Sequence, residues 1–215
     1  MKKAAIFYGG WDGHEPEQTA NIAKQLLESE NFEVKLFDTL EPLADKTQFE
    51  DYNLIIMNWT MGEIPQASFE SFRDLILSGV GFAGWHGGMG DAFRNNADYQ
   101  FIVGGQFVTH PDGIKDYTVN ITKHNDPIMQ GLSDFDMHSE QYYMHVDPSN
   151  EVLATTTHQN VQSTPWVNGT TIPVAWKRPF GKGRVFYSAL GHVAADFDVP
   201  EMREILRRGM LWAAK

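Results

Sequence analysis

Short apolar runs alternate with longer amphipathic stretches along the first half of this 215-residue chain. Apolar runs that end at glycine, asparagine or aspartate are typical of buried strands, whereas apolar residues at helical spacing indicate helices. The pattern predicts strands at residues 4–8, 33–37, 54–57 and 80–85, with helices at 15–30 and 65–77. Such alternation indicates a parallel sheet covered on both faces by helices.

The second half of the chain is richer in strand patterns. Alternating or apolar segments predict strands at residues 116–122, 151–157, 172–177 and 184–190, and a final amphipathic helix at 200–214. We therefore expect one α/β domain over residues 1–215, with a mostly parallel sheet and a β-rich second half. Ligands of such sheets bind beyond the carboxyl ends of the strands. The loops at 9–14, 58–62 and 86–91 are expected to meet there.

Charge and composition narrow the function classes. A net charge of −11 disfavours nucleic-acid binding, which usually needs a basic surface. No apolar segment approaches the length of a membrane span, and the first apolar run is too short for a secretory signal. The chain has no cysteine, which excludes disulfides, thiolate metal sites and cysteine nucleophiles. We expect a cytoplasmic protein without nucleic-acid or membrane partners.

The most informative stretch is Val-Gly-Phe-Ala-Gly-Trp-His-Gly-Gly at residues 80–88. A strand that enters a sharp glycine-flanked turn is typical of a nucleophile elbow, where the central residue is held in strained geometry. His86 takes the position at which serine or cysteine usually stands. Asp91, five residues later, is expected to orient its imidazole. The alternative is an ordinary glycine-rich turn.

Three further histidines follow strands or glycine motifs: His14 in Gly-His-Glu-Pro, His110 before Pro111, and His192 after Gly191. Each alone is weak evidence, and the alternative for each is a turn or a surface position. Together with His86 they predict a histidine-lined cleft, with a divalent metal such as zinc or manganese held by His86 and His110. No pair has helical metal-ligand spacing, so this site depends on tertiary convergence. His124 and His158 are expected on the surface.

Glu140 lies among aromatic residues and is the candidate acid or second base. Bulky neighbours are expected to raise the pKa of its carboxyl group, unless the side chain is solvated. Aromatic rings that can stack on sugars, together with polar residues near the motifs, form the candidate substrate-binding set; the alternative for the rings is the core. This set comprises Trp11, Asp12, Trp59, Trp85, Gln106, Tyr142 and His145.

The ordered motifs resemble the trehalose-utilisation (ThuA-like) family across essentially the whole chain. They are Gly-His-Glu-Pro at 13–16, Gly-Trp-His-Gly-Gly at 84–88, Gly-Gly-Gln-Phe to His-Pro at 104–111, Ser-Glu-Gln-Tyr at 139–142 and Gly-Lys-Gly-Arg-Val-Phe-Tyr to Leu-Gly-His at 181–192. The resemblance implies the class I glutamine amidotransferase-like superfamily, with a flavodoxin-like sheet but no amidotransferase cysteine. It also implies a role in disaccharide or glycoside catabolism, often beside oxidoreductases that make 3-keto sugars.

The leading functional prediction is a carbohydrate-processing enzyme that acts on a disaccharide, glycoside or keto-sugar derivative. His86, His14, His110, His192 and Glu140 would supply acid–base chemistry, with or without a divalent metal. This points to an isomerase, hydrolase or lyase and away from a glutamine amidotransferase. The alternative is a non-catalytic sugar-binding or regulatory protein on a degenerate amidotransferase scaffold. The expected partner is a small sugar, and a homodimer is the default assembly.

Overall fold

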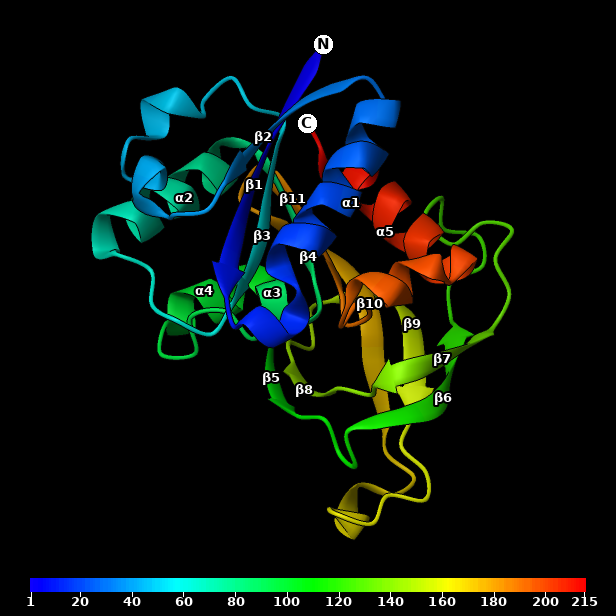
Figure 1. Ribbon diagram of the computed structural model, residues 1–215. Helices are drawn as coiled ribbons and strands as arrows, with labels where there is room; N and C mark the ends of the chain where they lie inside the picture. Colours follow the sequence, from blue (N-terminus) through cyan, green and yellow to red (C-terminus); the bar gives the residue numbers. More distant parts are fainter.

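The computed structural model describes residues 1–215, and a single large sheet organises it (Figure 1). Its strands are β1 (Lys2–Gly10), β2 (Phe32–Phe37), β3 (Leu54–Thr60), β4 (Gly81–Trp85), β6 (Ile114–Ile121), β7 (Phe135–Glu140), β9 (Glu151–Thr157), β10 (Thr171–Phe180) and β11 (Gly183–Ser188). They lie in the order β2-β1-β3-β4-β11-β10-β9-β6-β7. The strands from β2 to β11 are parallel neighbours, and those from β11 to β7 are antiparallel.

The helices cover both faces of the parallel part. They are α1 (Pro16–Ser29), α2 (Gln66–Ser78), α3 (His86–Gly90), α4 (Ala97–Val103) and α5 (Pro200–Ala213). Adjacent residues of a strand point to opposite faces. Gly81 of β4 lies directly against the carbonyl of Ala213 in α5, whereas the ring of Phe82 packs on Phe72 in α2, with centroids 4.8 Å apart. The predicted α/β class is therefore confirmed.

Sequence patterns located most elements within a few residues, but strand β7 was not predicted, and neither were two features outside the main sheet. Helix α4 has only seven residues, too few to show a helical period, and it is bounded by the Asn96 side chain and by Gly104 with a φ of 81°. The second is a small sheet of β5 (Gly105–Thr109) and β8 (Tyr143–Val146). The β-rich half otherwise extends the main sheet.

An apolar core of 59 buried residues fills the space between the sheet and its helices. None of the helices is long and apolar enough to cross a membrane. The core is packed closely where α5 lies on β11, because Gly209 brings the helix backbone against the ring of Phe186.

Replacement of Gly209 by valine tests this packing. An added Cβ would lie 2.2 Å from Cε1 of Phe186, which is fully buried and has no room to move. We expect the Gly209→Val variant to lose about 2 kcal/mol or more of unfolding free energy, measured in urea. Arg203→Ala, at an exposed position of the same helix, is the control. Equal stability of the two variants would contradict the described packing.

Candidate active site

The candidate site lies at the carboxyl ends of the parallel strands. Strand order changes direction between β1 and β3, the position at which sheets of this type bind ligands. His14 ends the short 3-10 helix Asp12–His14 that follows β1, and its Nδ1 lies 2.7 Å from Oγ1 of Thr60 at the end of β3. The amide of Met61 donates to the carbonyl of Asp91 beyond β4. The three predicted loops therefore meet, as expected.

His86 occupies a strained elbow. It is the first residue of α3, directly after β4, and has a φ of 44°, in the left-handed region that disfavours side chains with a Cβ. A Cβ on Gly87 would lie 2.4 Å from Cε1 of His14, and one on Gly88 would lie 2.3 Å from Oδ1 of Asn58. The Tyr187 hydroxyl donates to the His86 carbonyl. These glycines therefore allow the imidazoles of His14 and His86 to approach each other.

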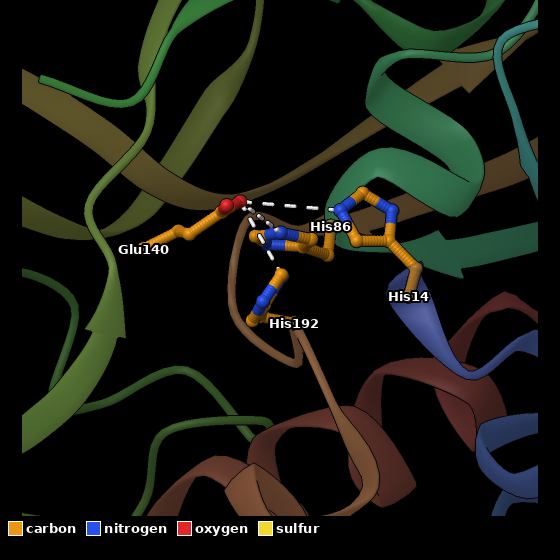
Figure 2. A group of neighbouring side chains, drawn as sticks. All are labelled: His14, His86, Glu140 and His192. Carbon is orange, nitrogen blue, oxygen red and sulfur yellow. Dashed lines mark hydrogen bonds and ion pairs between the residues drawn. The ribbon is translucent and has the colours of Figure 1, made fainter. Parts of the chain in front are cut away.

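Four side chains from distant segments converge around one carboxylate (Figure 2). Glu140 ends β7, and its Oε2 lies 3.1 Å from Nε2 of His86, 3.4 Å from Nδ1 of His192 and 3.9 Å from Nε2 of His14. The four potential ligand atoms all lie within 4.8 Å of one another. The predicted convergence of His14, His86, His192 and Glu140 is thus present in the structure.

The hydrogen bonds of His86 define its protonation. Nδ1 lies 2.8 Å from the carbonyl of Ala189, which can only accept, so Nδ1 carries the proton. Burial lowers the pKa of His86 to about 4, although Glu140 opposes this. At neutral pH the ring is therefore neutral, and its bare Nε2 faces a carboxylate oxygen. Two acceptors in contact need a cation or a proton between them.

Glu140 is a carboxylate, not an acid. Burial raises the pKa of Glu140, but its contacts with the rings of His14 and His86 lower it, and the net shift is below its usual range. Only a ring nitrogen that carries a proton stabilises the carboxylate, so with a bare Nε2 on His86 we attribute this shift to His14. The expectation of a raised pKa was wrong because the surroundings of Glu140 include ring nitrogens as well as apolar rings. Glu140 therefore acts as an anion or a metal ligand.

His192 supplies a third nitrogen without a partner. Its Nδ1 is buried and makes no hydrogen bond, and burial lowers the pKa of the ring, so the neutral form predominates. A buried ring nitrogen without a hydrogen-bond partner is costly unless something occupies the space beside it. Three imidazole nitrogens and one carboxylate oxygen are ligands that Zn²⁺, Mn²⁺ or Fe²⁺ accept. The cluster can hold a divalent metal.

Residues to which the sequence analysis assigned no role hold the His192 loop in place. The carboxylate of Asp196 accepts from the Ser139 hydroxyl at 2.6 Å and from the His192 amide at 2.9 Å. Oε2 of Glu15 accepts from the Ala194 amide at 2.9 Å. These bonds tie the loop after β11 to β7 and to the start of α1. Partners separated by this many residues leave no local signal in the sequence.

His110 lies beside the cluster but outside the group of four. Its Nε2 is 3.5 Å from the other carboxylate oxygen of Glu140, and its side chain is 42% exposed. Phe107 packs on one side of it, and Tyr142 stacks on the ring of His86, with centroids 3.9 Å apart. The predicted metal pair is therefore divided: His86 belongs to the convergent group, and His110 stands at its exposed edge.

The candidate substrate-binding residues are spread around this centre. Trp11 is 47% exposed and meets His14 edge-on, with centroids 4.7 Å apart, so it forms part of the rim. Asp12 is exposed beside it, and Trp59 is half-buried against Gly9 and Gly62.

Three other members of that set lie elsewhere. Trp85 is only 1% exposed and packs against Phe197, so it supports the elbow from the core and offers no surface to a sugar. Gln106 and His145 face each other across β5 and β8 and line a separate hollow of about 270 Å³.

The role expected of Asp91 and the position expected of His158 both differ from the structure. Asp91 binds Arg94 through two hydrogen bonds of 2.6 and 2.7 Å instead of orienting His86, a role taken by the Ala189 carbonyl. His158 is fully buried, not on the surface, and its Nε2 lies 3.3 Å from the Tyr142 carbonyl. Its place at the end of β9, inside the sheet, explains the burial.

The family model described as trehalose utilisation matches residues 3–213. The chain belongs to the ThuA family. No curated protein sequence matches it. Because the chain has no cysteine, this ThuA protein is not a classical glutamine amidotransferase.

Solved structures share the ThuA fold at low identity. A ThuA-like protein from Parabacteroides merdae ATCC 43184 is 19% identical, with a TM-score of 0.81 over 100% of this chain and 90% of that one. A cytoplasmic protein from Salmonella typhimurium LT2 is 12% identical, with a TM-score of 0.70 over both complete chains. A glutamine amidotransferase from Thermotoga maritima is 12% identical, with a TM-score of 0.54 over 100% of this chain and 90% of that one. The predicted family and superfamily fold are confirmed.

The neutral state of His86 is measurable in metal-free protein. Nitrogen-15 correlation spectra of the imidazoles are expected to show the Nδ1–H tautomer with a pKa of about 4. Between pH 6.5 and 4 the unfolded chain binds a proton that the folded chain does not, so unfolding free energy falls as pH falls through this window. The slope reaches about 1.4 kcal/mol per pH unit. A His86 ring protonated at pH 6 would contradict the assignment.

Proposed function

We propose that this ThuA protein is a metal-dependent enzyme of carbohydrate metabolism that acts on a sugar or keto-sugar derivative. The observation that carries the proposal is the contact of the bare Nε2 of His86 with the ionised carboxylate of Glu140, inside a group that also contains His14 and His192. A cation relieves the repulsion between these acceptors and uses the orphaned Nδ1 of His192. The family description of trehalose utilisation supports the substrate class.

The residues around the cluster have distinct proposed roles. His14, His86, His192 and Glu140 would hold a divalent metal, which would supply Lewis-acid polarisation of a carbonyl or hydroxyl oxygen of the bound sugar. His110, half-exposed and outside the ligand group, takes the proton from the carbon next to that carbonyl and returns it to a neighbouring atom. Trp11 stands at the rim, where its exposed ring can stack on the sugar. Delivered from His110 to the former carbonyl carbon, while the adjacent hydroxyl gives up its own proton, the proton completes an isomerisation. Delivered to an oxygen that leaves from the next carbon, it completes an elimination that releases water or an alcohol.

The surrounding features fit a cytoplasmic enzyme. The chain lacks cysteine, and the Salmonella protein of the same fold is described as cytoplasmic. We therefore propose cytoplasmic action on a small sugar.

A second function is favoured by a separate observation. The four main hollows of the surface, of 270 to 590 Å³, are not lined by any of the four clustered residues. A cluster that lines none of these hollows fits a sugar-binding or regulatory protein in which the four residues stabilise the fold. Turnover distinguishes the two functions, because a binding protein leaves its sugar unchanged.

Metal content tests the first part of the proposal. Untagged wild-type protein analysed by mass spectrometry is expected to carry about one divalent ion per chain, whereas His86→Ala and His192→Ala are expected to carry little. His124→Ala, at an exposed position, is the matched control and should keep the ion. Folded, metal-free wild-type protein that binds no added Zn²⁺, Mn²⁺ or Fe²⁺ would refute the metal site.

Proton transfer tests the second part, because isotope exchange can be followed even when the final product is unidentified. The protein is incubated in D₂O with 3-keto-trehalose or 3-keto-glucose, and deuterium at carbons next to the carbonyl is measured by NMR. We expect His110→Ala to keep its metal but to lose about 10²-fold or more of the exchange rate. His138→Ala, an exposed histidine, should exchange as the wild type does. Undiminished exchange in His110→Ala would remove His110 from the mechanism.

A further inference from the structure

Strands β6 and β9 separate soon after they meet. They pair in register only at Asn120–Thr155 and Ile121–Ala154. Farther along, the Thr118 carbonyl accepts from the side-chain hydroxyl of Thr156 instead of from a backbone amide. Beyond that point the gap opens into a hollow of about 400 Å³, which we call the β6–β9 wedge. A volume of this size is typical of small-molecule sites.

Gln141 lines the wedge from behind the candidate active site. Successive residues of an extended chain point in opposite directions, so Gln141 faces away from the cluster that Glu140 enters. Gln141 is only 1% exposed. Its Nε2 donates to Oγ1 of Thr156 at 2.8 Å and to the Thr157 carbonyl at 3.3 Å. The amide is thus anchored on its nitrogen side.

The Gln141 amide cannot be reversed, and its oxygen is left without a partner. The Thr157 carbonyl only accepts, and the Thr156 hydroxyl already gives its proton to Thr118, so both require the NH₂ group. The oxygen Oε1 of Gln141 is buried and has no hydrogen-bond donor. A buried, unpaired acceptor is unfavourable, and a hydroxyl group that reaches it removes this cost.

The remaining wall of the wedge is polar but close to neutral. Asn160 and Gln159 offer side-chain amides, and Tyr117 contributes a ring. Asn120 presents its amide oxygen, because its nitrogen donates to Asp134, and the Thr157 hydroxyl is bonded to that of Thr171.

The carboxylate of Asp116, also in this wall, is paired with His138 at 2.7 Å. The ammonium group of Lys115 donates to the Gln159 carbonyl at 3.1 Å. It also lies 3.9 Å from a carboxylate oxygen of Asp112, which offsets its charge. Amides and hydroxyls beside an aromatic ring match a neutral, polyhydroxylated ligand better than an anion or an apolar molecule.

We infer that the β6–β9 wedge is a second, non-catalytic saccharide site, in which a sugar hydroxyl donates to Oε1 of Gln141. The choice of ligand class rests on the proposed function in carbohydrate metabolism. The wedge and the histidine cluster lie back to back on one peptide, because Gln141 directly follows Glu140 and the Tyr117 hydroxyl donates to the Glu140 carbonyl at 3.3 Å. A sugar bound in the wedge contacts the same chain segment that positions Glu140.

Two-dimensional NMR of the whole protein tests this inference. Trehalose and D-glucose are titrated into ¹⁵N-labelled wild-type protein, and the side-chain amide of Gln141 is assigned by its absence in Gln141→Leu. Saturable shifts of the Gln141 and Asn160 amides are expected. Gln141→Leu should weaken this binding at least tenfold. Gln159→Ala, which removes an exposed side chain at the wedge, should weaken it without disturbing the fold.

Two controls separate the wedge from the cluster. Gln130→Ala deletes an exposed glutamine outside the wedge and should bind as the wild type does, and His86→Ala should keep the wedge shifts even where it loses metal. Sugar shifts confined to the cluster and abolished in His86→Ala would overturn the wedge inference while supporting the proposed function. Saturable shifts at the wedge, in a protein that binds no metal and catalyses no deuterium exchange, would support the wedge inference and overturn the proposed function. No saturable shift with either sugar would overturn the inference.

Discussion

The contact between the Glu140 carboxylate and three imidazole rings is the constraint around which this end of the molecule is arranged. An anion buried beside neutral rings is stable only if the ring nitrogens that face it carry protons or share a cation with it, and each ring arrives from a different loop. The strained elbow at His86, the close glycine contact with His14 and the carboxylate of Asp196 behind His192 all serve this placement. The sheet supplies the frame, because its parallel strands end on one edge.

Much of this arrangement was predictable from the sequence. Buried strands and amphipathic helices have periods that any local window shows, and glycines around His86 indicated a sharp turn that the positive φ confirms. The ordered motifs also identified the family. The convergence of His14, His86 and His192 could be anticipated only as a group, because each follows a strand of the parallel part of the sheet. Glu140 instead ends the antiparallel edge strand β7.

The remaining features depend on packing that no local pattern records. Trp85 and His158 are buried because neighbouring elements cover them, and the sequence around each gives no sign of this. The direction of the pKa shift of Glu140 depends on rings more than 50 residues away, such as His192. Helix α4 and the pairing of β5 with β8 are too short to show a period.

The spacing of the four clustered residues along the chain has a thermodynamic consequence. Positions 14, 86, 140 and 192 draw together both ends of the sequence and both halves of the sheet. An ion that binds them only in the folded state adds RT ln(1 + [L]/Kd) to stability, about 2.7 kcal/mol at a hundredfold excess over Kd. The ion would then hold these distant segments together, and the supply of metal in the cell would help to decide how much of this protein remains folded.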